Sequence, residues 1–111
     1  MEKLVVINSD KMGQGDEELG TRLMANFLSK LIDAESKPQI LVFYNSGVKL
    51  AAKGSAVLES LHSLENLGVK IICCGTCVNF YGLVDQIEAG RVSNMLEIVK
   101  VLTEAKETVT I

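Results

Sequence analysis

Proline and histidine are scarce in this sequence: Pro38 and His62 are the only examples. A cysteine hydrolase needs a base beside its thiol, and histidine is the usual one. His62 is flanked by Glu59, Ser63 and Asn66 in a segment with helical spacing, so we expect a solvated residue on the polar face of a helix. A Cys-His dyad is therefore not expected within one chain.

Runs of basic residues and long apolar runs are also missing. The net charge is −3 with acids and bases interspersed, which argues against nucleic-acid binding through phosphate neutralisation. The apolar runs are far shorter than the ~20 residues of a membrane span. Met1-Glu2-Lys3 leads directly into a predicted strand, which leaves no room for a secretory signal. We expect one cytoplasmic domain over residues 1–111 that binds neither nucleic acid nor membrane.

Three cysteines are present, and all lie within the five residues from Cys73 to Cys77. Their number is odd, and they lie too close together in the sequence to stabilise a fold through disulfide bonds. Clustered cysteines of this kind are typical of chemistry in the reducing cytosol rather than of structural disulfides.

Strand and helix patterns alternate along the chain. Continuous apolar runs with β-branched residues predict strands buried on both faces, and apolar positions at helical spacing predict the helices. The expected strands are Leu4–Ile7, Ile40–Tyr44, Val69–Cys73, an edge strand Thr108–Ile111 and a very short strand at Val92. The expected helices are Asp16–Ala34, one capped by Ser55, Val78–Ala89, with a break near Gly82 as the alternative, and one from Asn94 to Leu102; an irregular connection is expected at 48–54. This alternation predicts a Rossmann-like three-layer α/β domain: a mostly parallel sheet of four or five strands with helices on both faces.

Three loops leave the carboxyl ends of the predicted strands: 8–15, 45–54 and 74–77. Ligands of open parallel sheets bind at this edge, so we expect the loops to converge on one pocket. The first loop contains G-x-G, but Gly20 comes two residues too late for the dinucleotide pattern, and a simple glycine-bearing turn explains it equally well. Phe80 is expected in the core. The candidate pocket residues are Asp10, Met12, Gly13, Gly15, Asn45, Ser46, Gly47, Lys49 and Tyr81.

Cys74 and Cys77 form a C-x-x-C motif where a strand ends and a helix begins. The free N–H groups of a first helical turn favour thiolates, so the pKa of Cys77 is predicted to lie below about 8.5. Cys74 is predicted to assist Cys77 or to form a disulfide with it, and Cys73 to pack as a small buried hydrophobe. The alternative is a tight turn in which both thiols only pack.

Three chemistries use such a pair. Thioredoxin-like exchange requires a facing proline, whereas Pro38 precedes the second predicted strand. Zinc requires four converging ligands, but Cys73 and Cys74 point to opposite faces and no second C-x-x-C or H-x-x-H is present. Carriage of sulfur or selenium as a persulfide or selenosulfide requires one exposed reactive thiolate. No metal and no cofactor is expected.

The motif blocks together resemble a known family. The residues Asn8–Gly20, Phe43–Leu50, Cys74–Cys77, Phe80–Leu83 and Ser93–Met95 look like the C-terminal DsrE-like domain of YedF proteins, which are called sulfurtransferase-like proteins of selenium metabolism. More distantly the chain resembles DsrE and TusD, sulfur-relay subunits whose single active cysteine matches Cys77 by position. The resemblance implies a Rossmann-like fold, persulfide carriage and a homo- or hetero-oligomer.

Two departures from that family matter. YedF proteins usually carry an N-terminal TusA-like domain, which this chain lacks, so it is expected to be either an excised domain or a stand-alone relative. The resemblance also implies a TusA-like sulfur carrier protein as a partner. The relay subunits lack Cys74, so its presence here indicates a disulfide-capable or a redox-gated variant. The leading hypothesis is a sulfur or selenium relay protein that carries the atom on Cys77. The alternatives are a small-ligand or partner-binding module with a redox-sensing C-x-x-C, and a dithiol oxidoreductase.

Overall fold

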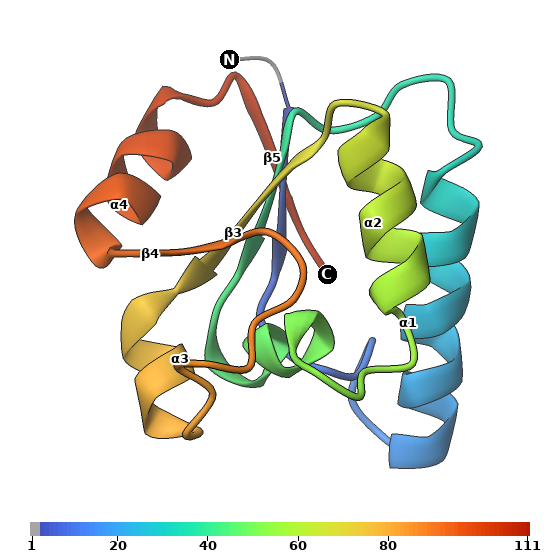
Figure 1. Ribbon diagram of the computed structural model, residues 1–111. Helices are drawn as coiled ribbons and strands as arrows, with labels where there is room; N and C mark the ends of the chain where they lie inside the picture. Colours follow the sequence, from blue (N-terminus) through green and yellow to red (C-terminus); the bar gives the residue numbers. More distant parts are fainter. Residues whose placement is uncertain (1–2) are drawn as a thin grey trace.

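The computed structural model describes residues 3–111; the expectation for Met1 and Glu2 lies outside this range. Five parallel strands form one sheet in the order β4-β3-β2-β1-β5 (Figure 1). The elements are β1 Lys3–Ile7, α1 Glu17–Leu31, β2 Ile40–Phe43, the 3-10 helix η1 Asn45–Ala51, α2 Leu58–Asn66, β3 Lys70–Cys74, α3 Gly75–Phe80, β4 Arg91–Ser93, α4 Met95–Glu104 and β5 Glu107–Thr110. The predicted α/β class with a parallel sheet is confirmed.

The direction of the last crossover explains the three layers. From β1 to β4 the chain moves strand by strand toward one edge of the sheet, and then it returns across the whole sheet to place β5 beside β1. Parallel crossovers are right-handed, so reversing the direction of travel places the connecting helix on the opposite face. Accordingly α1 and α2 cover one face and α4 covers the other (Figure 1).

Each central strand divides its side chains between two cores. Alternate residues such as Val5, Phe43 and Cys73 pack with α1, α2 and η1 in the larger cluster. The intervening residues, such as Val42 and Cys74, pack with α4 in the smaller one. This double burial is why the strands read as continuous apolar runs rather than as alternating patterns.

Several predicted boundaries are close to the observed ones. Asp16 caps α1, and its Oδ1 accepts a hydrogen bond from the Leu19 N–H at 2.9 Å. The short strand at Val92 is present as β4. Asn94 caps α4, because its Oδ1 accepts from the Glu97 N–H at 2.9 Å.

Two predicted segments are wrong. The helix expected over 78–89 is only the six-residue α3, which begins earlier, at Gly75, and ends at Phe80, in agreement with the alternative of a break near Gly82. It stops because Gly82 adopts a φ of 69°, and the following loop bonds instead to the end of η1, where Glu88 and Ala89 donate their N–H groups to the Ala51 carbonyl. The irregular connection expected at 48–54 is largely η1.

An ion-pair cluster ties β4 to the start of α4. Arg91 donates two hydrogen bonds to Glu97, at 2.8 and 2.5 Å, and the Ser93 hydroxyl also donates to this carboxylate. These donors lower the pKa of the Glu97 carboxyl to about 2.

No helix within residues 3–111 has the length and apolar character to cross a bilayer.

Glu97→Gln is expected to destabilise the protein at neutral pH and to have a diminishing effect in acid. The folded-state pKa is depressed, so the carboxylate stabilises the fold fully above its unfolded pKa of about 4.3. That contribution is lost as the pH falls toward the folded value of about 2. Urea unfolding of the wild type and the variant across this range measures it. A stability difference that does not change with pH, or an equal response in the exposed Glu104→Gln control, would contradict the assignment.

Candidate functional site

The candidate site lies where β2 and β3 end side by side. No loop separates β3 from α3: Cys74 is both the last strand residue and the helix N-cap, and Cys77 is the third helical residue. Gly75 allows this abrupt turn, because a Cβ there would lie 2.6 Å from the Ser93 carbonyl oxygen of β4. The C-x-x-C motif is thus held at the carboxyl edge of the sheet, as its position after a strand predicted.

The three free thiols have different surroundings. Cys73 is fully buried against the α1–α2 face, and this burial raises its pKa to about 12. Cys74 is 1% exposed and packs on the α4 face. Cys77 is half-buried and touches both clusters. Only Cys77 therefore combines a partly open surface with a position at the edge of the sheet.

A small cavity of about 270 Å³ surrounds the Cys77 thiol, lined by Asn45, Thr76, Cys77, Phe80 and Tyr81. The backbone N–H of Asn45 donates a hydrogen bond to Cys77 Sγ at 3.0 Å. This contact joins the first residue of η1 to α3 across the ends of β2 and β3. A backbone N–H aimed at sulfur favours the thiolate over the thiol.

The predicted low pKa of Cys77 is wrong for the structure as it stands. Burial raises the pKa of this thiol; the Asn45 N–H opposes the shift, and the neighbouring Cys74 thiol adds to it. The reason is that α3 has only six residues, so its aligned peptide dipoles are few, whereas the cavity is largely apolar.

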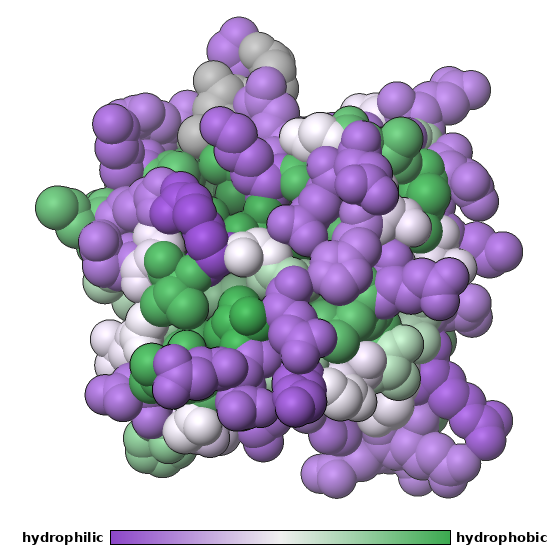
Figure 2. All heavy atoms as spheres, viewed as in Figure 1, coloured by the Kyte–Doolittle hydropathy of each residue, from purple (hydrophilic) through white to green (hydrophobic). Residues whose placement is uncertain are grey.

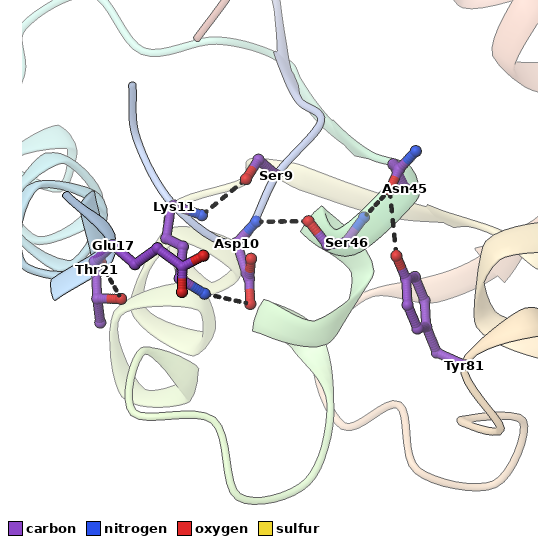
Figure 3. Close-up of polar contacts among 8 residues, drawn as sticks. All are labelled: Ser9, Asp10, Lys11, Glu17, Thr21, Asn45, Ser46 and Tyr81. Carbon is purple, nitrogen blue, oxygen red and sulfur yellow. Dashed lines mark hydrogen bonds and ion pairs between the residues drawn. The ribbon is translucent and has the colours of Figure 1, made fainter. Parts of the chain in front are cut away.

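Asn45 is the hub of the polar contacts around the cavity. Its Oδ1 accepts hydrogen bonds from the Tyr81 hydroxyl at 3.2 Å and from the Ser46 N–H at 2.9 Å (Figure 3). The Lys49 ammonium lies 4.5 Å from the centre of the Tyr81 ring, a cation–π contact. Of the residues expected to form the pocket, Asn45 and Tyr81 therefore line this cavity, whereas Ser46, Gly47 and Lys49 do not.

The first loop does not line this cavity. Its connection is indirect, because the Asp10 N–H donates to the Ser46 hydroxyl at 3.1 Å (Figure 3). Asp10 and Lys49 line a separate cavity of about 200 Å³, and Met12 lines a groove along α1. Gly13 and Gly15 are exposed. The three loops therefore do not meet in one pocket, because the first loop lies toward α1.

Gly47 has a packing function that the sequence did not reveal. It is buried in η1, and a Cβ at this position would lie 2.2 Å from the Ile7 carbonyl oxygen at the end of β1. Its lack of a side chain lets η1 press against the sheet, which in turn places Asn45 beside Cys77.

Two lining residues were missed by the sequence reasoning. Thr76 was treated only as a spacer in C-x-x-C, and Phe80 was expected in the core but is 82% exposed. α3 ends at Phe80, so this ring lies at the end of a short helix rather than in the core. Tyr81 packs edge-on against its ring at 5.2 Å.

Apolar side chains also remain exposed around β4. Figure 2 shows hydrophobic atoms gathered near the middle and left of the viewed face, on the side of β3, β4 and α4. The exposed large hydrophobics of this side are Phe80, Val84, Val92, Met95, Leu96 and Val99. Phe80, at the cavity, and Leu96, on α4, are the most exposed of these side chains, at 82% each.

The remaining site chemistry is simple. Among residues 3–111, no group of three His, Cys, Asp or Glu side chains is arranged to hold a metal ion. His62 lies exposed on α2, as expected, and its Nε2 contacts the Glu88 carbonyl at 3.0 Å.

Native alkylation with iodoacetamide is expected to modify Cys77 alone. Its thiol is half-open, whereas Cys73 and Cys74 are buried. Because burial raises the pKa of Cys77, the rate should keep rising with pH beyond the range of an ordinary cysteine. Peptide mass spectrometry over a pH series measures both which cysteine is labelled and how fast it is labelled. Equal labelling of Cys74, or a rate that has reached its plateau at neutral pH, would contradict this.

The fold and site together define a class of protein: a parallel α/β protein with one accessible cysteine at the carboxyl edge of its sheet. The model of the DsrE/DsrF-like family matches residues 1–111, and the chain belongs to this family. Membership suggests a role of the sulfur-relay type. No curated protein matches the chain.

Solved structures share the fold at low sequence identity. The ychN protein from E. coli is 18% identical with a TM-score of 0.73, and all of each chain is covered. The protein of unknown function MTH1491 from Methanobacterium thermoautotrophicum is 24% identical with a TM-score of 0.64, covering 96% of this chain and 99% of that one. The conserved protein BT1422 from Bacteroides thetaiotaomicron is 16% identical with a TM-score of 0.68, covering 99% and 95%. These likenesses concern the fold alone.

Proposed function

We propose that this protein carries a sulfur or selenium atom on Cys77, as a persulfide or selenosulfide, within a sulfur-relay pathway. The observation that carries the proposal is the setting of this one thiol: half-buried in a small apolar cavity, with a backbone N–H on its sulfur. A carrier must shield a bound sulfane sulfur from water and small thiols and still admit a partner's cysteine. A small, mostly apolar cavity satisfies both needs.

The transfer needs no cofactor. The Cys77 thiolate attacks the outer sulfur of a donor persulfide, the donor's S–S bond breaks, and the donor leaves as a thiolate. An acceptor thiolate then attacks the outer sulfur on Cys77, and the Cys77 thiolate is the leaving group. Each step exchanges one S–S bond for another, so no net oxidation occurs.

The finer assignment follows the resemblance to YedF proteins and its motif blocks. It proposes selenium as an alternative cargo, a TusA-like carrier protein as donor or acceptor, a cytoplasmic setting and a homo-oligomer. The exposed apolar residues beside β4 support contact with a protein partner. Because Phe80 belongs both to these exposed residues and to the cavity lining, a partner bound there would reach the thiol.

A second candidate function is dithiol oxidation. Cys74 and Cys77 occupy the N-cap and third positions of α3, and the Cys74 thiol adds to the rise that burial causes in the pKa of Cys77. Both side chains pack in the cluster on the α4 side of the sheet, so the two thiols are already neighbours.

Sulfur loading tests the proposal directly. Incubation with a persulfide donor should add the mass of one sulfur atom to the wild type and to Cys73→Ser, and none to Cys77→Ser. Retained loading of Cys77→Ser would refute the site. No loading of the wild type by any donor would refute carriage. Loss of two hydrogen masses without added sulfur, dependent on Cys74 and Cys77 together, would favour dithiol chemistry.

A further inference from the structure

We propose that Asn45 is a positioning residue: its left-handed backbone conformation fixes an N–H on Cys77 Sγ and thereby sets the stability of the Cys77 thiolate. In this proposal Asn45 acts through its backbone N–H, and its side-chain amide does not contact a ligand. The relevance of this hydrogen bond to sulfur transfer rests on the proposed function, whereas its effect on the ionisation of Cys77 does not.

The backbone at Asn45 is unusual. Its φ is 52°, and within residues 3–111 Asn45 is the only residue other than glycine with a positive φ. Left-handed conformations are disfavoured for most residues, although asparagine tolerates them better than most. The preceding Tyr44 is extended, with φ −143° and ψ 174°, so the Asn45 N–H continues outward from β2. The left-handed turn then directs the chain into η1 while that N–H still faces the sulfur.

Side-chain contacts hold this conformation. Asn45 Oδ1 accepts from both the Ser46 N–H and the Tyr81 hydroxyl (Figure 3). The Lys49 ammonium in turn covers the Tyr81 ring. Behind the turn, Gly47 is in contact with the end of β1. The turn is thus held by contacts with α3, within η1 and with the sheet.

The N–H matters because the rest of the cavity opposes charge. The thiol is desolvated by a largely apolar lining, and Cys74 beside it adds no positive charge. In each transfer step Cys77 Sγ carries the negative charge, first as nucleophile and then as leaving group. A donor fixed 3.0 Å from this atom stabilises both states.

Alkylation of Cys77 by iodoacetamide tests the proposal without any sulfur donor. In Asn45→Ala the left-handed turn is disfavoured, and the rate at neutral pH should fall about tenfold, equivalent to one pKa unit, with the midpoint of the pH profile shifted upward. Asn45→Gly tolerates the turn but has no Oδ1 to hold it, and Tyr81→Phe removes one anchor. For each of these two variants we expect a fall of about threefold.

The direction of the change separates this function from simple structural support. Loosening the cavity would expose the thiol and speed alkylation at every pH, whereas loss of the N–H slows it. Asn66→Gly at the exposed end of α2 and Tyr44→Phe serve as matched controls and should keep the wild-type profile. Wild-type or faster alkylation in Asn45→Gly and Tyr81→Phe would overturn the proposal, even if Asn45→Ala fails to fold. Should sulfur loading fail while these shifts appear, the proposed function falls and the positioning of the thiolate stands.

Discussion

Gly47→Ala is expected to destabilise the protein by about 3 kcal/mol, near the upper end of the usual cost of overpacking. The added Cβ would lie 2.2 Å from the Ile7 carbonyl oxygen, a backbone atom that cannot swing aside. This oxygen already accepts a hydrogen bond from the Tyr44 N–H. Relief therefore requires η1 to lift from the end of β1, which also separates Asn45 from Cys77. Chemical unfolding measures the first effect, and the rate of Cys77 alkylation reports the second.

Gly54→Ala is the matched control for this substitution. Gly54 has a φ of 88°, and a Cβ added there would have no heavy atom within 4 Å, so alanine meets backbone strain without a clash. The expected cost is about 1 kcal/mol, with no change in Cys77 reactivity. Equal destabilisation by the two alanines would show that the close approach of η1 to β1 is not the constraint that Gly47 satisfies.

Phe43→Ala is expected to cost about 4 kcal/mol, within the range measured for truncation of buried phenylalanines. The ring is fully buried at the end of β2, in the cluster between the sheet and the helices α1 and α2. Domains of this size are stable by only about 5–15 kcal/mol, so the variant should unfold at a much lower urea concentration.

Phe80→Ala makes the same chemical change on the surface. Its ring is 82% exposed, so its loss should change the free energy of unfolding by no more than about 0.5 kcal/mol. Urea unfolding of the two variants under the same conditions compares the loss of a buried ring with the loss of an exposed ring at the site. A large cost for Phe80→Ala would mean that its ring is covered in solution, as a partner or a second copy of the chain would cover it.

Much of the fold could be predicted because its signals are local. Double burial makes each central strand a continuous apolar run, and the caps Asp16 and Asn94 mark helix starts within a residue. The prediction of a helix over 78–89 was wrong because the apolar residues of this segment follow a helical period, whereas its backbone contacts are with a distant part of the chain. The N–H groups of Glu88 and Ala89 bond to Ala51, a pairing that no local pattern shows.

The site was predicted in outline and corrected in detail. The sequence alone determined that the C-x-x-C pair follows a buried strand at the ligand edge of a parallel sheet, since strand order and motif spacing are properties of the chain. Only the tertiary structure decided what surrounds each thiol. The pKa of Cys77 follows from the balance between an apolar cavity and the N–H of Asn45, a residue from another strand's end. Burial and hydrogen bonding between distant segments control ionisation, so the character of this cysteine is a property of the fold.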